Sequence, residues 1–149
     1  MFGNLFIKPR SPKTLQEFGQ EIARELGLGE ITERESSNYR DGVYLSAKCL
    51  GVGISLALTD DDDVAEYPFH MGMKADGFWV DDGDAFELLA DLLARKLTIE
   101  GYSVARCPDF GRMDAAVLRY SVKPGMRGHG RSEIEVATNS PPPTDSTPT

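Results

Sequence analysis

The chain has 149 residues, 40% of them hydrophobic, and a formal net charge of −8 at pH 7. This length and composition favour a single globular domain with a real core. Residues 123–149 contain three bases and three acids, so the acid excess belongs to residues 1–122. A negatively charged domain repels phosphate groups, which excludes direct binding to nucleic acid or to an anionic membrane and favours basic proteins as partners.

The first part of the chain contains one helix with a clear start. Residues 4–8 are compatible with a short strand or an ordered arm, and the prolines that follow end any regular element. Thr14 and Glu17 have the spacing of a capping box, which predicts a helix from Leu15, and Gly27 ends it. The apolar residues of this helix recur every three or four positions and share one face: Leu15, Phe18, Ile22 and Leu26.

Four strand candidates follow, two of them in a hairpin. Residues 31–36 form a weak candidate, since they contain a single large apolar residue. Residues 43–50 and 52–59 are apolar runs with alternating faces, and Gly51 between them indicates an antiparallel hairpin. Residues 66–75 are predicted to return as a further strand after an acidic loop.

A second helix is predicted in the middle of the chain. Residues 78–80 form a short strand candidate, and Asp84 and Glu87 then have capping spacing. The helix is predicted to end at Gly101, and its acidic first turn and basic last turn suit the helix dipole. Its predicted apolar stripe is Phe86, Leu89, Leu92, Leu93 and Leu97.

Two further strands and a tail complete the predicted organisation. Residues 102–106 and 115–122 have strand patterns. After Lys123 the chain is rich in Gly, Pro, Ser and Thr, and its low hydrophobicity cannot offset the entropy of ordering. We therefore expect one domain over residues 1–123 and a flexible tail over residues 124–149. The predicted fold class is α+β, an antiparallel sheet of about five strands with two helices packed on one face.

Four consecutive aspartates at positions 60–63 are the most unusual feature of the sequence. They open a stretch to residue 91 that holds eleven acids and one base, Lys74. Adjacent carboxylates repel one another unless they are solvated or face a cation. Calcium loops space their ligands at alternate positions with a Gly at the bend, a spacing that this run lacks, so we expect no metal and no cofactor. The alternative to a functional role is a solvated loop between two strands.

Aromatic residues lie close to these acids in the sequence. Charge steers a basic partner, and aromatic side chains supply much of the binding energy at interfaces. Phe69 and Phe78 are expected in the core, whereas Tyr67 and Trp79 are candidates for the surface. The predicted partner-binding residues are Asp60, Asp61, Asp62, Asp63, Glu66, Tyr67, Trp79, Asp81, Asp82 and Asp84.

Candidate catalytic residues are sparse. His70 is the only histidine before residue 123, and it is either a general base acting with a nearby carboxylate or a plain surface residue. Cys49 is predicted to pack on the core, whereas Cys107 is predicted in a loop, with Arg106 beside it. Two cysteines are too few for a disulfide scaffold, and reduced thiols in the cytoplasm are the expectation.

The size, acidity, lack of catalytic motifs and α+β pattern resemble those of immunity proteins of bacterial polymorphic toxins, including contact-dependent growth inhibition systems. The residues that carry the resemblance are the hairpin at 43–59, the aspartates at 60–63 and the segment 66–84. The resemblance implies a cytosolic protein that binds one cognate toxin domain, often a basic nuclease, and blocks its active site. Carboxylates of such proteins commonly take the place of nucleic-acid phosphates.

Three functions are compatible with these features of the sequence. The first is a non-enzymatic, cytoplasmic immunity protein that neutralises a basic toxin through its acidic surface. The second is an acidic adaptor or chaperone for a secreted effector, which binds its client through apolar surface. The third is a small hydrolase that uses His70 with a carboxylate. Neither a signal peptide nor a membrane span is expected from the hydropathy of the chain.

Overall fold

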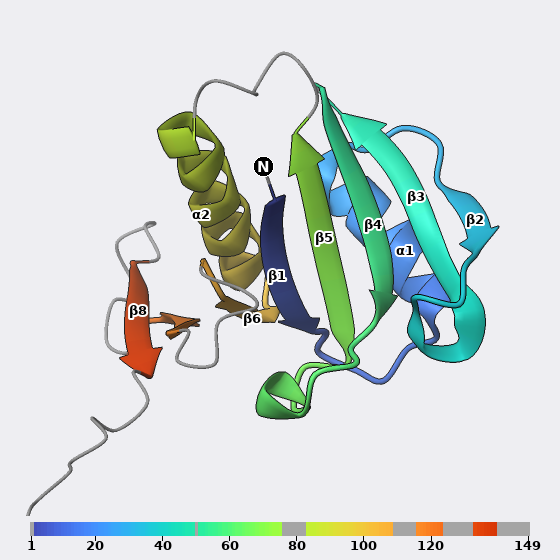
Figure 1. The fold of residues 1–149 in the computed structure, drawn as a ribbon. Helices are drawn as coiled ribbons and strands as arrows, with labels where there is room; N and C mark the ends of the chain where they lie inside the picture. Colours follow the sequence, from blue (N-terminus) through green and yellow to red (C-terminus); the bar gives the residue numbers. More distant parts are fainter. Residues whose placement is uncertain (1, 50, 76–82, 109–115, 124–132, 140–149) are drawn as a thin grey trace, which may run out of the picture.

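A computed structural model describes residues 2–49, 51–75, 83–108, 116–123 and 133–139 of the protein. Within these residues eight strands form one sheet, in the order β2-β3-β4-β5-β1-β6-β7-β8, and every neighbouring pair is antiparallel (Figure 1). The strands are β1 (Phe2–Lys8), β2 (Thr32–Glu35), β3 (Val43–Cys49), β4 (Val52–Leu58), β5 (Phe69–Ala75), β6 (Ser103–Arg106), β7 (Val117–Val122) and β8 (Ile134–Asn139).

The N-terminal strand β1 lies in the middle of the sheet, where it joins two groups of strands. It pairs with β5 on one side, from Phe2 opposite Lys74 to Ile7 opposite Phe69, and with β6 on the other. Its three consecutive apolar residues at positions 5–7 are all buried, as expected for a strand that is covered on both faces. The structure thus decides between a strand and an arm in favour of a central strand.

Two helices accompany the sheet, α1 (Leu15–Leu26) and α2 (Gly83–Ile99). The predicted capping box is confirmed, since Thr14 Oγ1 accepts a hydrogen bond from the Glu17 amide at 3.1 Å and Glu17 Oε1 accepts one from the Thr14 amide at 3.0 Å. Gly27 ends α1 with a left-handed φ of 63°. Neither helix, nor any other helix of the described residues, is long and apolar enough to cross a membrane.

Residues of both helices belong to one buried cluster against one face of the sheet. Phe18 of α1 stacks on Phe69 of β5 with ring centroids 4.1 Å apart. Gly19 permits α1 to lie close to Leu45 of β3, because a Cβ at that position would lie 2.3 Å from Leu45 Cδ1. Figure 1 shows α1 behind β3 and β4 and α2 alongside β1. The α+β class and the antiparallel sheet with two helices are therefore confirmed.

A smaller buried cluster lies on the opposite face of the sheet. Phe6 points there because successive side chains of a strand alternate between faces, and its neighbours Leu5 and Ile7 face the helices. Val64 and Tyr67, from the connection between β4 and β5, cover Phe6 together with Ala105, Cys107 and Val117. The acid-rich connection is thus folded back onto the sheet.

The prediction of about five strands is wrong, since the described part of the sheet has eight. One extra strand, β8, lies in the segment predicted to be tail, and it pairs with β7 from Val117 opposite Asn139 to Val122 opposite Ile134. The physical reason is a short alternation, in which Ile134 and Val136 pack against the main cluster while Glu135 between them is exposed. Residues 124–132 and 140–149 of the predicted tail lie outside the described residues.

The second helix also differs in detail from its prediction. It begins at Gly83, so Asp84 lies within its first turn, and its last residue is Ile99, with Gly101 at a positive φ of 103° just beyond it, as predicted. Leu92, predicted to be in the apolar stripe, is 54% exposed, while the small residues Ala90 and Ala94 are buried. Small side chains on the inner face allow the helix to lie close to the sheet. The predicted strand at 78–80 lies outside the described residues.

Candidate functional site

The aspartates at positions 60–63 form a tight structure, which we name the acidic turn. It begins the connection between β4 and β5 and includes the start of a short 3₁₀ helix, η2 (Asp62–Val64). Asp61 Oδ1 accepts a hydrogen bond from the Asp63 amide at 2.9 Å, and the Thr59 amide donates to the Pro68 carbonyl at 2.9 Å. In Figure 1 this is the green turn at the lower end of β4 and β5. Three of the aspartates are exposed and Asp61 is half-buried.

The residues after the acidic turn anchor it to the sheet. Val64 and Tyr67 are buried in the smaller cluster. The Tyr67 hydroxyl accepts a hydrogen bond from Arg119 at 2.9 Å, and Arg119 also forms an ion pair with Glu66. Sequence analysis assigned Tyr67 and Glu66 to an exposed binding surface. The structure instead buries Tyr67 and partly neutralises Glu66, because β7 brings Arg119 beneath this connection.

A hollow that we name the trough crosses the open face of the sheet. Its floor lies low because the side chains there are small, and the register aligns Ser46 with Ser55, Ser55 with Gly72, and Gly72 with Asn4. One part of the trough has a volume of about 330 Å³ and the next part about 370 Å³, and Tyr39 and His70 line both. Together they reach from the middle of the sheet to the acidic turn.

The trough has an aromatic wall and oppositely charged ends. Tyr39 stacks on Tyr44 with ring centroids 4.4 Å apart, which holds the loop before β3 over the sheet. Lys48 and Lys74 lie at one end, on either side of Gly53 in the register. Asp60 and Asp61 line the other end together with Arg40, so two acids and one base leave this end negative. The positive end was not predicted, because Lys48 and Lys74 are far apart in the sequence and meet only through strand pairing.

His70 forms part of the wall opposite Tyr39. Its Nε2 lies 2.6 Å from Asn4 Oδ1, and because an amide oxygen only accepts, Nε2 carries the proton. The imidazole stacks on Phe6 with ring centroids 4.9 Å apart. Burial lowers the pKa of His70 from 6.5 to about 4, although the nearby Asp61 carboxylate opposes this effect. The expectation of a plain surface histidine is therefore wrong, and the ring is neutral at pH 7.

This pKa predicts a loss of stability in mild acid. The folded-state pKa of His70 lies below its ordinary value of 6.5, so protons bind the unfolded chain more tightly. The stabilisation is complete above pH 6.5 and declines as the pH falls, by up to about 3 kcal/mol at pH 4. Urea unfolding at pH 7 and pH 4.5 should show a larger loss in the native protein than in the His70→Gln variant, which retains the carboxylates. Equal losses in the two proteins would contradict the prediction.

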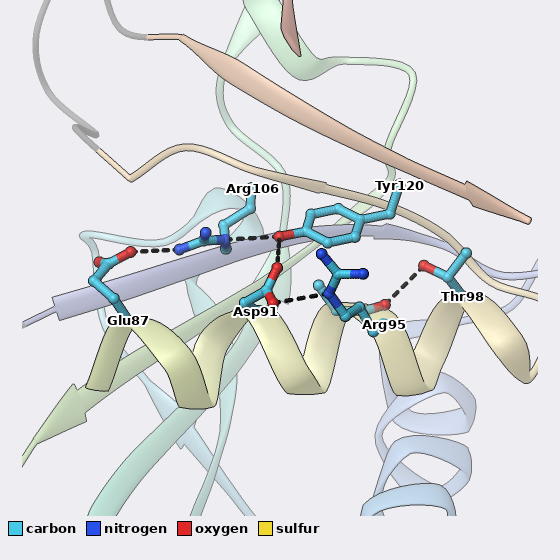
Figure 2. Close-up of polar contacts among 7 residues, drawn as sticks. Glu87, Asp91, Arg95, Thr98, Arg106 and Tyr120 are labelled. Atoms are coloured by element: carbon cyan, nitrogen blue, oxygen red, sulfur yellow. Dashed lines mark hydrogen bonds and ion pairs between the residues drawn. The ribbon is translucent and has the colours of Figure 1, made fainter. Parts of the chain in front are cut away.

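A polar network beneath α2 was also missed by sequence analysis (Figure 2). The Arg106 guanidinium donates to Glu87 Oε2 at 2.5 Å and to the Tyr120 hydroxyl at 3.1 Å. Tyr120 donates to Asp91 Oδ1 at 2.7 Å, and Arg95 donates to Asp91 Oδ2 at 2.8 Å. The four-residue spacing of Glu87, Asp91 and Arg95 on the helix was a visible signal. The partners on the strands, Arg106 and Tyr120, gave no such signal in the sequence. Because these hydrogen bonds join α2 to β6 and β7, we interpret the network as a clamp between the three elements.

The titration of the network suits this structural role. Burial alone would raise the pKa of Asp91, but hydrogen bonds from Tyr120 and Arg95 lower it on balance. Burial raises the pKa of Tyr120, and its hydrogen bond to Asp91 raises it further. The carboxylate therefore stays charged and the phenol stays protonated at neutral pH, which preserves every hydrogen bond of the clamp.

The two cysteines are free thiols. Cys49 is half-buried against the main cluster, in agreement with its predicted core position. Cys107 follows β6 outside any strand, as predicted, and it is buried in the smaller cluster. Burial raises the pKa of the Cys107 thiol, and the Asp61 carboxylate adds to this effect. The physical reason is that the connection bearing Val64 and Tyr67 covers it.

The side chains of the remaining predicted site residues lie outside the described part of the chain. Trp79, Asp81 and Asp82 lie outside the described residues, and so does the side chain of Asp84 in the first turn of α2. In the described part of the chain, no group of three or more His, Cys, Asp or Glu residues is placed to hold a metal ion. Of the predicted acids, the acidic turn alone is therefore shown beside a hollow.

Comparison of the chain with models of protein families, with curated proteins and with solved structures finds no match. The function is therefore argued from the geometry of the acidic turn and the trough.

Proposed function

We propose that this protein is a non-enzymatic, cytoplasmic immunity protein that binds and neutralises a basic toxin domain. The observation that carries the proposal is the anchored acidic turn. Its carboxylates form no ion pair within the described residues, whereas the neighbouring Glu66 is paired with Arg119. Four adjacent carboxylates on an anchored turn repel one another, and a cationic partner relieves this repulsion.

Anchoring improves the acidic turn as a binding surface. A flexible loop loses conformational entropy when it binds, and this loss subtracts from the affinity. Val64 and Tyr67 hold the turn against the sheet before any partner arrives. Clustered charge also raises the rate of association with an oppositely charged protein, and salt screens this effect. A nuclease with a basic cleft for nucleic acid is a partner of suitable chemistry.

Neutralising the acidic turn tests the proposal. We expect replacement of Asp60, Asp61, Asp62 and Asp63 by Asn to lower the association rate with a basic toxin domain encoded beside this protein by about ten- to a hundredfold at low salt. The rate should also lose most of its dependence on salt. Both are measured by surface plasmon resonance between 20 and 300 mM NaCl.

A matched control separates the turn from net charge. The variant with Gln at the exposed residues Glu33, Glu35, Glu133 and Glu135 changes the net charge by the same amount, at the two edges of the sheet. Its association rate should remain within about threefold of the native rate. If both variants bind equally slowly, net charge rather than the acidic turn controls association. If the native protein binds no such domain, the proposed function is wrong.

One observation favours the adaptor or chaperone as the second candidate. Leu88, Leu92 and Ile99 are 57%, 54% and 51% exposed and lie on one side of α2. A client held on this apolar stripe would bind with little dependence on salt. The same measurements therefore distinguish the two functions, since replacing Leu88 and Leu92 by Ser would weaken the client complex and leave the toxin complex unchanged.

A further inference from the structure

The trough is shaped by a row of missing side chains on the open face of the sheet. Gly53 and Gly72 have no side chain, and Ser46 and Ser55 have small ones. Strand pairing places these residues side by side across β3, β4 and β5. Larger residues on both sides, the Tyr39 ring and the His70 ring, make this strip a channel instead of a flat surface.

The acidic end of the trough combines the groups that recognise an organic cation. The hollow of about 370 Å³ is lined by Tyr39 as well as by Asp60 and Asp61, and Arg40, which also lines it, donates to the Thr59 carbonyl at 3.2 Å. A guanidinium or ammonium group gains from a carboxylate through charge-assisted hydrogen bonds and from an aromatic face through a cation–π contact. The site therefore fits a Lys or Arg side chain.

The other end has the opposite charge at a defined separation. Lys48 is exposed and lies opposite Gly53 of β4 in the register. The acidic end of the trough begins at Leu58, five residues after Gly53 along β4. At the usual rise of a strand this separation is about 17 Å. Alternate residues of an extended chain face the same side, so two side chains that enter the trough lie an even number of positions apart.

We propose that the trough receives an extended segment of the partner protein, with a Lys or Arg side chain at Asp60 and Asp61 and an Asp or Glu side chain, four or six residues away, at Lys48. This inference rests on the proposed function, because it names the part of the partner that the acidic face recognises. The trough is open along one side and does not enclose a small molecule. An extended segment that lies along it uses both charged ends at once.

Peptides test the trough without the toxin. The probes are acetylated and amidated ten-residue peptides of Gly, Ser and Thr that carry one Arg and one Glu, one to six positions apart. We expect the native full-length protein to bind the peptides with separations of four or six at least fivefold more tightly than the peptide with adjacent charges, as measured by fluorescence polarisation in 20 mM NaCl. No binding, or equal binding at every separation, would overturn the inference.

A variant that fills the channel gives the second arm of the test. A Cβ at Gly53 would come no closer to a neighbour than 3.7 Å, from the Lys74 carbonyl oxygen, so Gly53→Val fits the fold and favours the strand. It should keep the native melting temperature or raise it and should weaken binding of the preferred peptide at least tenfold. Ala137→Val, an exposed change on β8, is the control and should bind normally. Undiminished binding by Gly53→Val would overturn the inference.

The two proposals fail in different ways. If Gly53→Val binds the toxin domain normally while the Asn variant of the acidic turn does not, the proposed function stands and the trough is not the recognition site. If no toxin domain binds, the proposed function fails, and the peptide series still decides whether the trough accepts a charged extended segment.

Discussion

Replacement of Arg106 by Ala is expected to lower the free energy of unfolding by about 3 kcal/mol. Arg106 is 8% exposed and donates to both Glu87 and Tyr120. Its removal leaves a cavity against α2 and takes a hydrogen-bond donor away from the buried Tyr120 hydroxyl. The half-exposed Glu87 is resolvated by water, so its share of the loss is small. Urea unfolding at pH 7 measures the effect.

Arg95 provides the matched control at the other end of the same network. Its side chain is partly exposed and pairs with Asp91 one helical turn away. Arg95→Ala should therefore lower the free energy of unfolding by less than about 1 kcal/mol. Equal losses for Arg95→Ala and Arg106→Ala would mean that burial does not strengthen the network, which would contradict its interpretation as a clamp.

Replacement of Val64 by Asp is expected to release the acidic turn and expose the Cys107 thiol. Val64 is fully buried in the smaller cluster that also contains Cys107. Burial of a valine contributes about 1.5–3 kcal/mol, and a carboxylate cannot take its place against the sheet. Opening of the connection should become about ten- to a hundredfold more frequent. The rate of Cys107 alkylation at pH 8, measured in a Cys49→Ser background, should rise by the same factor.

The exposed neighbour Ala65 supplies the control for this experiment. Ala65→Asp adds the same charge to the same turn without entering the cluster. Its alkylation rate should stay within about twofold of the background protein. If Ala65→Asp reacts as fast as Val64→Asp, the added charge rather than the lost anchor exposes the thiol. Unchanged alkylation of Val64→Asp would show that the turn is held by Tyr67 and Arg119 alone.

Local signals predicted the elements whose causes lie within a few residues. The capping box of Thr14 and Glu17, the left-handed Gly27 and the hairpin around Gly51 each depend on short-range hydrogen bonds or backbone conformation. The predicted position of the acidic turn, between two strands, is likewise confirmed. Such features are readable because the residues that cause them are adjacent in the chain.

Features that depend on distant pairing were not predicted. The alternation of β8 was too short to stand out from the polar segment around it, and it became a strand because β7 offered an unpaired edge. Tyr67 was predicted at the surface, yet Arg119, 52 residues away, binds its hydroxyl. The burial of Cys107 was not predicted, because its own segment carries no sign of Val64, which packs in the same cluster.

The sequence by itself determined the acidic character of this protein, the two helices and the place of the four aspartates in a connection between strands. These depend on composition and on periodicities of two and 3.6 residues, which are properties of the chain alone. Only the tertiary structure decided that the connection is anchored, that Lys48 and Lys74 form an opposite pole, and that glycine and serine residues from separate strands align into a trough. The reason is physical: strand register converts residues far apart in sequence into neighbours about 5 Å apart, and no local pattern encodes that distance.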